Sequence, residues 1–258
     1  MFDSVIQGLL QGVTEYLPVS SSGHLSLFQQ LSNFQGPTLA FDVVLHLATL
    51  LATVLYFWRD ILLFSTQFFG GFGKAQLRSS EGWRVGWSVV VATLVTGLVG
   101  LAIKDVAEAA TGSLTMLGLL WLVTACLCFM ANWLPENSCR IGLKIGLLVG
   151  LAQGFAVMPG ISRSGATIVT ALALGVSGAE AFRFSFLASL PAIVGAAILE
   201  LKDVTSMALP SGWWLGFIVA FVVGLVCLVL LRQIVNRRRW WPFGVYCGAL
   251  GLLCLFVI

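Results

Sequence analysis

Long apolar segments separated by short polar breaks dominate the chain. Apolar runs that approach or exceed the roughly 20 residues needed to cross a bilayer as a helix fall at residues 40–58, 83–103, 112–134, 180–200, 211–231 and 240–257. Two further stretches, residues 2–33 and 140–176, are interrupted by proline, glycine and serine. We interpret each as a re-entrant helical hairpin, because broken backbone at membrane depth must lie inside protein or line a wet cavity. Residues 59–82, between the first two spans, read as a polar linker.

The two halves of the chain resemble each other in their first helices. G-L-L-Q-G at residues 8–12 matches G-L-L-V-G at residues 146–150, and Gln153 then takes the place of Glu15. Chance similarity is the alternative, because segments composed mainly of glycine and leucine often match each other by chance. The order of the breaks that follow favours a true repeat.

Those breaks are P-V-S-S-S-G at residues 18–23 and P-G-I-S-R-S-G at residues 159–165. We interpret residues 1–134 and 140–258 as two repeats, each built of one hairpin and three spans. An odd number of spans between the hairpins gives the repeats inverted topology, which should bring the two broken tips together near the membrane midplane.

Composition places the chain in the membrane class. Hydrophobic residues make up 59% and charged residues 10% of the chain, whereas a soluble domain carries about 25% charged residues. We therefore expect an all-α integral membrane protein, folded as a single domain over residues 1–258. The sequence holds no basic stripe with interleaved aromatic residues, so nucleic acid is not an expected partner.

Positive charge is distributed unevenly between the two faces that this topology creates. Ten basic side chains fall on one face: Arg59, Lys74, Arg78, Arg84, Arg140, Lys144, Arg232, Arg237, Arg238 and Arg239. The other face holds two, Lys104 and Lys202. By the positive-inside rule the first face is cytoplasmic. Both termini and the opening of the first hairpin should then lie outside.

Arg163 occupies the second break, just before a helix restarts. A guanidinium beside glycines, hydroxyls and a helix N-terminus is typical of sites for phosphate-like anions. The residues expected around the anion are Gly160, Ser162, Ser164, Gly165 and Thr167. The alternative is an arginine that caps a helix or neutralises Glu15.

Glu15 is the acidic residue of the first break, and an ionisable residue at membrane depth indicates a functional site. Gln11 lies one helical turn before it, so both side chains can point at one centre. Together they could hold Mg²⁺ or Ca²⁺ against phosphate oxygens. The alternative for Gln11 is a hydrogen bond between helices.

Three consecutive serines, Ser20, Ser21 and Ser22, follow in the first break. One would cap the next helix, but three exceed what capping requires. A serine near a carboxylate and an imidazole could act as a nucleophile. His24 is then either a proton-transfer group or a structural hydrogen-bonding group, whereas His46, in a plain apolar run, reads as structural.

Residues 11–24, Q-G-V-T-E-Y-L-P-V-S-S-S-G-H, together with residues 159–167, P-G-I-S-R-S-G-A-T, resemble the BacA family of undecaprenyl-diphosphate phosphatases. The resemblance implies a multi-pass hydrolase of the bacterial cytoplasmic membrane that releases phosphate from undecaprenyl diphosphate. It further implies recycling of this lipid carrier for cell-wall synthesis, and bacitracin resistance.

The resemblance also implies roles for single residues. It marks Ser21 as the active serine and implies catalytic roles for Glu15, His24 and Arg163. Gln11 stands where many members have a second glutamate, and Ser22 where many have threonine. The residues that we expect to contact the substrate are Gln11, Ser20, Ser22, Gly160, Ser162, Ser164, Gly165 and Thr167.

Several alternatives stay open at this point. Ser21 would either attack phosphorus or orient water, and the cation expected at Gln11 and Glu15 is Mg²⁺ or Ca²⁺. The expected partners are an isoprenyl diphosphate lipid and the bilayer, with a homodimer left open. A transporter or flippase of an isoprenyl phosphate or other anion is the alternative function, since broken helices in inverted repeats are typical of transporters. The serine, histidine and glutamate favour hydrolysis, because binding alone needs no nucleophile.

Reporter fusions test the orientation. An enzyme that is active only outside the cytoplasm should be active when fused to either terminus, and inactive when inserted beside Lys74, because basic loops are retained inside. Activity of the reporter beside Lys74 would contradict the assignment.

Overall fold

The structure is a computed structural model that describes residues 1–32, 38–135, 137–204 and 209–256, with only the backbone described for residues 38 and 201–204. Within these ranges the regular structure is helical throughout, which confirms the all-α expectation. The last residue of the first predicted hairpin, residue 33, and the side chain of Lys202 lie outside what is described.

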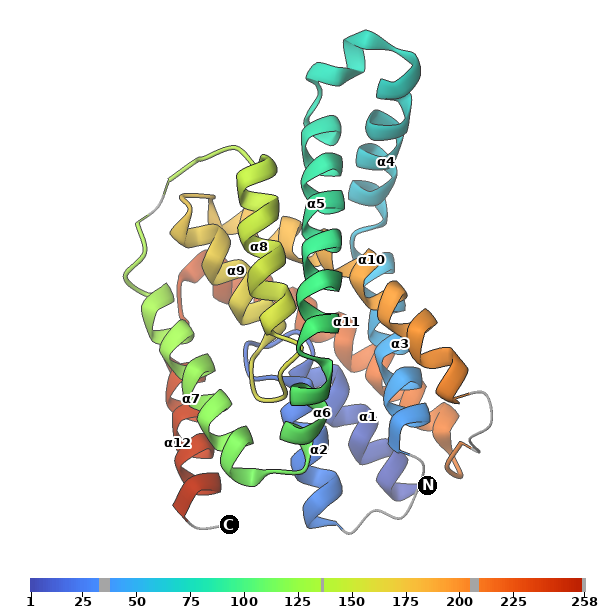
Figure 1. Cartoon of the computed structure of the whole chain (residues 1–258), viewed down its shortest axis with the longest axis vertical. Helices are drawn as coiled ribbons and strands as arrows, with labels where there is room; N and C mark the ends of the chain where they lie inside the picture. The colour runs from blue at the N-terminus through green and yellow to red at the C-terminus, as the bar shows by residue number, and fades with distance from the viewer. Residues whose placement is uncertain (33–37, 136, 205–208, 257–258) are drawn as a thin grey trace.

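Helices follow one another closely in both halves of the chain (Figure 1). The first half contains α1 (Phe2–Thr14), α2 (Ser21–Leu31), α3 (Thr38–Tyr56), α4 (Trp58–Gly73), the 3₁₀ helix η1 (Ala75–Ser79), α5 (Glu81–Ala102), α6 (Lys104–Thr111) and α7 (Leu114–Ala131). The second half contains α8 (Leu143–Phe155), α9 (Arg163–Ala173), α10 (Gly178–Val204), α11 (Trp213–Arg237) and α12 (Trp241–Phe256).

Five of the described helices are long and apolar enough to cross a membrane: α3, α5, α7, α10 and α11. The sixth expected span corresponds to α12, which is apolar but has 16 residues. These helices fit a multi-pass membrane protein.

Residues 59–82 are mostly helical, so their interpretation as a polar linker was wrong. α4 runs beside the first half of α5 and projects beyond the other helices (Figure 1). The ring centroid of Phe68 on α4 lies 5.6 Å from those of both Trp83 and Trp87 on α5. Through these aromatic contacts α4 packs against α5. The polar residues among the aromatic ones hid this packing in the sequence pattern.

Two helix pairs are broken inside the molecule. The pair α1–α2 is interrupted at residues 15–20 and the pair α8–α9 at residues 156–162. We refer to residues 15–22 as tip 1 and residues 156–164 as tip 2. α1 and α2 occupy the lower part of the view and α8 and α9 the upper part (Figure 1). The tips meet where the Gly160 backbone N–H donates to Ser20 Oγ at 3.0 Å.

α7 and α12 cross at two glycines. A Cβ at Gly251 would lie 2.7 Å from the carbonyl oxygen of Gly118, and a Cβ at Gly118 would lie 2.8 Å from that of Gly251. Real side chains do not approach backbone oxygens so closely, so the crossing requires residues without a side chain. Such small-residue contacts are how helices approach each other in a membrane.

This crossing predicts opposite effects for two Gly→Ala substitutions. Gly251→Ala should destabilise the protein by about 1–3 kcal/mol through overpacking. Gly97→Ala on α5, where a Cβ would have no atom within 4 Å, should leave stability unchanged or raise it, because alanine favours helix over glycine. Thermal unfolding in one detergent, followed by tryptophan fluorescence, measures both. Equal shifts would contradict the packing argument.

Candidate active site

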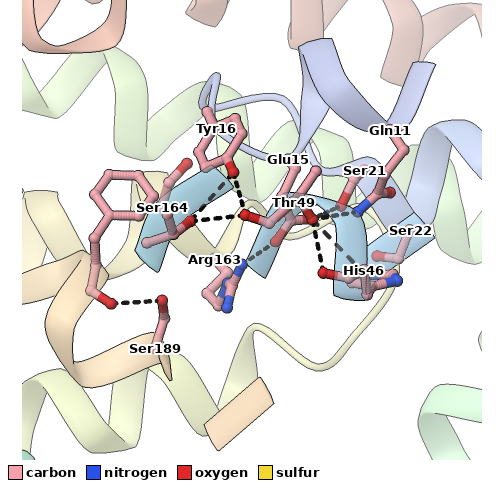
Figure 2. Close-up of polar contacts among 12 residues, drawn as sticks. Gln11, Glu15, Tyr16, Ser21, Ser22, His46, Thr49, Arg163, Ser164 and Ser189 are labelled. Atoms are coloured by element: carbon pink, nitrogen blue, oxygen red, sulfur yellow. Dashed lines mark hydrogen bonds and ion pairs between the residues drawn. The ribbon is translucent and has the colours of Figure 1, made fainter. Parts of the chain in front are cut away.

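Glu15 lies at the centre of a buried polar cluster (Figure 2). It directly follows α1, and its side chain is 5% exposed. One carboxylate oxygen, Oε1, forms an ion pair with the guanidinium of Arg163. The other, Oε2, accepts hydrogen bonds from Ser21 Oγ at 2.5 Å and from Gln11 Nε2 at 3.1 Å. The structure therefore brings together four predicted site residues from both tips.

Arg163 is the first residue of α9, and its position follows from the turn before it. Ser162 is the N-cap, and its Oγ accepts from the Gly165 N–H at 3.1 Å. Gly160 has φ +102°, a left-handed conformation that favours glycine. This turn places a guanidinium and a helix N-terminus at the same point, and both attract anions.

Ser20 joins the tips rather than facing the carboxylate. Besides the bond from Gly160, its Oγ accepts the Gly23 N–H at 3.4 Å as the cap of α2. Ser20 itself has φ 68°, which is rare for a residue other than glycine. Such strain persists only where the surroundings fix the backbone. Ser22 Oγ lies 3.4 Å from Ser20 Oγ, so among these serines Ser21 is the one that donates to Glu15.

The other predicted hydroxyls support tip 2. Ser164 Oγ lies 3.2 Å from Ser162 Oγ and 3.5 Å from the Leu17 carbonyl of tip 1. Thr167 Oγ1 donates to the Arg163 carbonyl at 2.8 Å and lies 2.5 Å from Ser185 Oγ on α10. In the structure the hydrogen bonds of these hydroxyls run to protein groups around the tips.

The sequence left His24 as either a proton-transfer group or a structural hydrogen-bonding group, and in the structure its ring contacts groups other than Ser21 and Glu15. Its Nδ1 lies 2.7 Å from the Ser20 carbonyl, and its Nε2 lies 2.7 Å from the hydroxyl of Tyr246 on α12. A carbonyl oxygen can only accept, so Nδ1 carries the hydrogen. Both ring nitrogens are then engaged when Tyr246 donates to Nε2. His24 therefore braces tip 1 against α12.

His46 on α3 is the histidine that lies beside Glu15, with 3.8 Å between its Nε2 and Glu15 Oε2 (Figure 2). Its Nδ1 lies 2.8 Å from the Asp42 carbonyl, so Nε2 faces the cluster. Reading His46 as structural overlooked a periodic signal. Asp42, His46, Thr49 and Thr53 form a polar stripe along a largely apolar helix, the same kind of pattern that marked Gln11 and Glu15.

A cation held jointly by Gln11 and Glu15 stays a prediction. Gln11 directs its amide N–H, not its oxygen, at the carboxylate, and Arg163 already neutralises that carboxylate. Gln11 Oε1 is buried and has no hydrogen-bond partner among the described residues. The amide would have to turn over before both side chains could present oxygens, the ligands that Mg²⁺ and Ca²⁺ prefer.

A comparison with known proteins assigns the chain to a protein family. A family model described as "Bacitracin resistance protein BacA" matches residues 4–253. The chain belongs to the BacA family.

Relatives within the family match over almost their whole length. A protein of Desulfosudis oleivorans named undecaprenyl-diphosphatase is 40% identical, covering 98% of this chain and 97% of the relative. Proteins of the same name from Thermomicrobium roseum and Syntrophotalea carbinolica are 36% and 40% identical. The first covers 100% of this chain and 98% of the relative, and the second 96% and 95%. The match thus includes both tips.

Proposed function

We propose that the protein is a membrane hydrolase that converts undecaprenyl diphosphate to undecaprenyl phosphate and inorganic phosphate. The observation that carries the proposal is the Ser21–Glu15–Arg163 cluster: a serine hydroxyl bonded to a buried carboxylate, beside a guanidinium at a helix N-terminus. The undecaprenyl-diphosphatase relatives supply the substrate class. Recycling of the lipid carrier for cell-wall synthesis, with bacitracin resistance, follows from that activity and the family.

Arg163 would bind the terminal phosphoryl group. Phosphoryl transfer spreads negative charge over the equatorial oxygens, and a positioned guanidinium stabilises that charge. Because Arg163 pairs with Glu15 in the structure, the substrate would replace the carboxylate as its partner. Glu15 would keep its hydrogen bond to Ser21 during this exchange.

Ser21 and Glu15 would then carry the proton transfer. If Ser21 attacks, its hydroxyl proton passes to Glu15 while a bond forms between Oγ and the terminal phosphorus. The bond from that phosphorus to the bridging oxygen breaks, and undecaprenyl phosphate leaves with the electron pair. Water later hydrolyses the phosphoserine. If Ser21 instead orients water, Glu15 receives the proton of that water.

The proposed fold of two inverted repeats is supported by matching contacts in the two halves. A Cβ at Gly12 of α1 would lie 2.9 Å from the Ala220 carbonyl of α11. A Cβ at Gly150 of α8 would lie 2.7 Å from the Ala92 carbonyl of α5. In both cases the second residue that the Cβ would contact is a valine three residues after the alanine. We infer that α1 with α11 and α8 with α5 are equivalent pairs, with the tips as re-entrant hairpins.

We further propose six spans, with α12 as the sixth, and an active-site opening on the external face of the bacterial cytoplasmic membrane. The start of α1 and the end of α12 lie at the same end of the molecule (Figure 1), as an even number of spans requires. The isoprenyl tail would lie in lipid or between helices. A homodimer stays a prediction, and the names of the relatives support hydrolysis rather than transport.

Phosphate release from undecaprenyl diphosphate by the purified protein in detergent tests the function. Arg163→Lys should lower kcat/KM by about 100-fold, because the charge remains but the bidentate fork is lost. Glu15→Ala should lose activity to a similar extent. If both variants retain near wild-type rates, the site assignment fails. If the wild-type protein releases no phosphate, the function itself fails.

Rapid quenching with substrate labelled at the terminal phosphorus decides the role of Ser21. We expect the label on the wild-type protein and its loss in Ser21→Ala, because a hydroxyl bonded to a carboxylate can be activated as a nucleophile. Ser65 on α4, which lies outside both tips, supplies the matched Ser→Ala control and should leave labelling unchanged. Turnover without any labelled protein would favour direct attack by water.

A further inference from the structure

One face of α7 contacts tip 1. Trp121 donates its indole N–H to the Val19 carbonyl at 2.9 Å. About two helical turns further on, the Cys128 thiol lies 3.6 Å from the Pro18 carbonyl. Both side chains are fully buried. α7 therefore supplies partners for backbone carbonyls that the break between α1 and α2 leaves without helical ones.

Thr124, on the same face of α7, contacts tip 2. Its hydroxyl donates to the Gly160 carbonyl at 2.7 Å and accepts the Ser162 N–H at 3.0 Å. Threonine hydroxyls inside helices commonly bond to the carbonyl four residues back, as Thr93 does with Val89 at 2.8 Å. Thr124 instead reaches across to another segment, and its exposed fraction is 0%.

These two bonds bracket the turn that leads into Arg163. Gly160 lies against the α7 backbone, where a Cβ would come within 3.0 Å of the Leu117 carbonyl. Ser162 is the N-cap of α9. A single buried hydroxyl thus satisfies a carbonyl and an N–H on either side of Ile161, and so fixes where α9 begins. The position of the guanidinium depends on that starting point.

We propose that Thr124 is a positioning residue of the hydrolysis, acting through Arg163; this rests on the proposed function. Without the hydroxyl, the turn keeps a buried donor and a buried acceptor without partners and shifts to satisfy them. A displacement of about 1 Å of a catalytic group can cost on the order of 100-fold in rate. Thr124 touches neither carboxylate nor nucleophile, so its effect must pass through the turn.

Thr124→Val is the direct test, because valine keeps the shape and removes the hydroxyl. We expect kcat for phosphate release to fall at least about 10-fold with KM changed by less than about threefold, since the displaced group matters most in the transition state. Thr124→Ser restores the hydroxyl and should keep at least about a third of wild-type kcat. Thr93→Val, the matched control, should leave both constants unchanged. Wild-type kcat in Thr124→Val would overturn the proposal.

The Arg163→Lys background separates positioning from a general structural effect. If Thr124 acts through the guanidinium, adding Thr124→Val to Arg163→Lys should lower kcat by less than about threefold, because interacting residues are not additive. A full, additive loss in the double variant would overturn the proposal.

Gel filtration and thermal unfolding verify that each variant is folded. Should Thr124→Val fail to fold, Thr124→Ala, which also lacks the hydroxyl, is measured in its place against Thr124→Ser. Suppose that wild type is active, that Arg163→Lys is impaired and that the folded variant without the hydroxyl has a normal rate. This outcome overturns the role of Thr124 and leaves the proposed function standing. An inactive wild type would instead count against the proposed function.

Discussion

The ion pair between Glu15 and Arg163 is the interaction on which the two halves of the protein depend. Each charge lies in a tip where a helix is broken inside an apolar molecule. An uncompensated charge in such a place costs several kcal/mol, whereas an opposite charge in contact offsets much of that cost. Each tip therefore stabilises the position of the other. The pairing of distant residues supports the fold and also assembles the site.

Broken helices carry a second cost, which the structure meets with side chains. Backbone groups that are buried away from water need other hydrogen-bond partners, so each break needs partners supplied by neighbours. Ser20 provides one across the tips, and Trp121 and Thr124 provide others from α7. This explains why polar residues are scattered through otherwise apolar helices. Most of these polar side chains form hydrogen bonds with backbone groups, and few face the Glu15 carboxylate.

The proposed chemistry likewise depends on supplying partners to polar and charged groups. The Arg163 guanidinium, which is paired with a carboxylate in the structure, can pass to a phosphoryl group that is also negatively charged, so this partly buried cation keeps an anionic partner. The carboxylate that is released still accepts from Ser21. Binding and activation of the serine would thus be linked by a single exchange of partners, with α9 directing its positive end to the same place.

Local pattern in the sequence determined the class of the protein, the five helices that are long and apolar enough to cross a membrane, and the two breaks. The helical period and the backbone preferences of proline, glycine and serine depend on neighbouring residues in the chain. They can therefore be recognised in the amino-acid sequence alone. Tertiary structure alone decided that α4 packs on α5, that His24 faces Tyr246 and that His46 faces Glu15. The partner of an imidazole or a hydroxyl is set by which helix lies opposite, and that helix is often a hundred or more residues away in the chain.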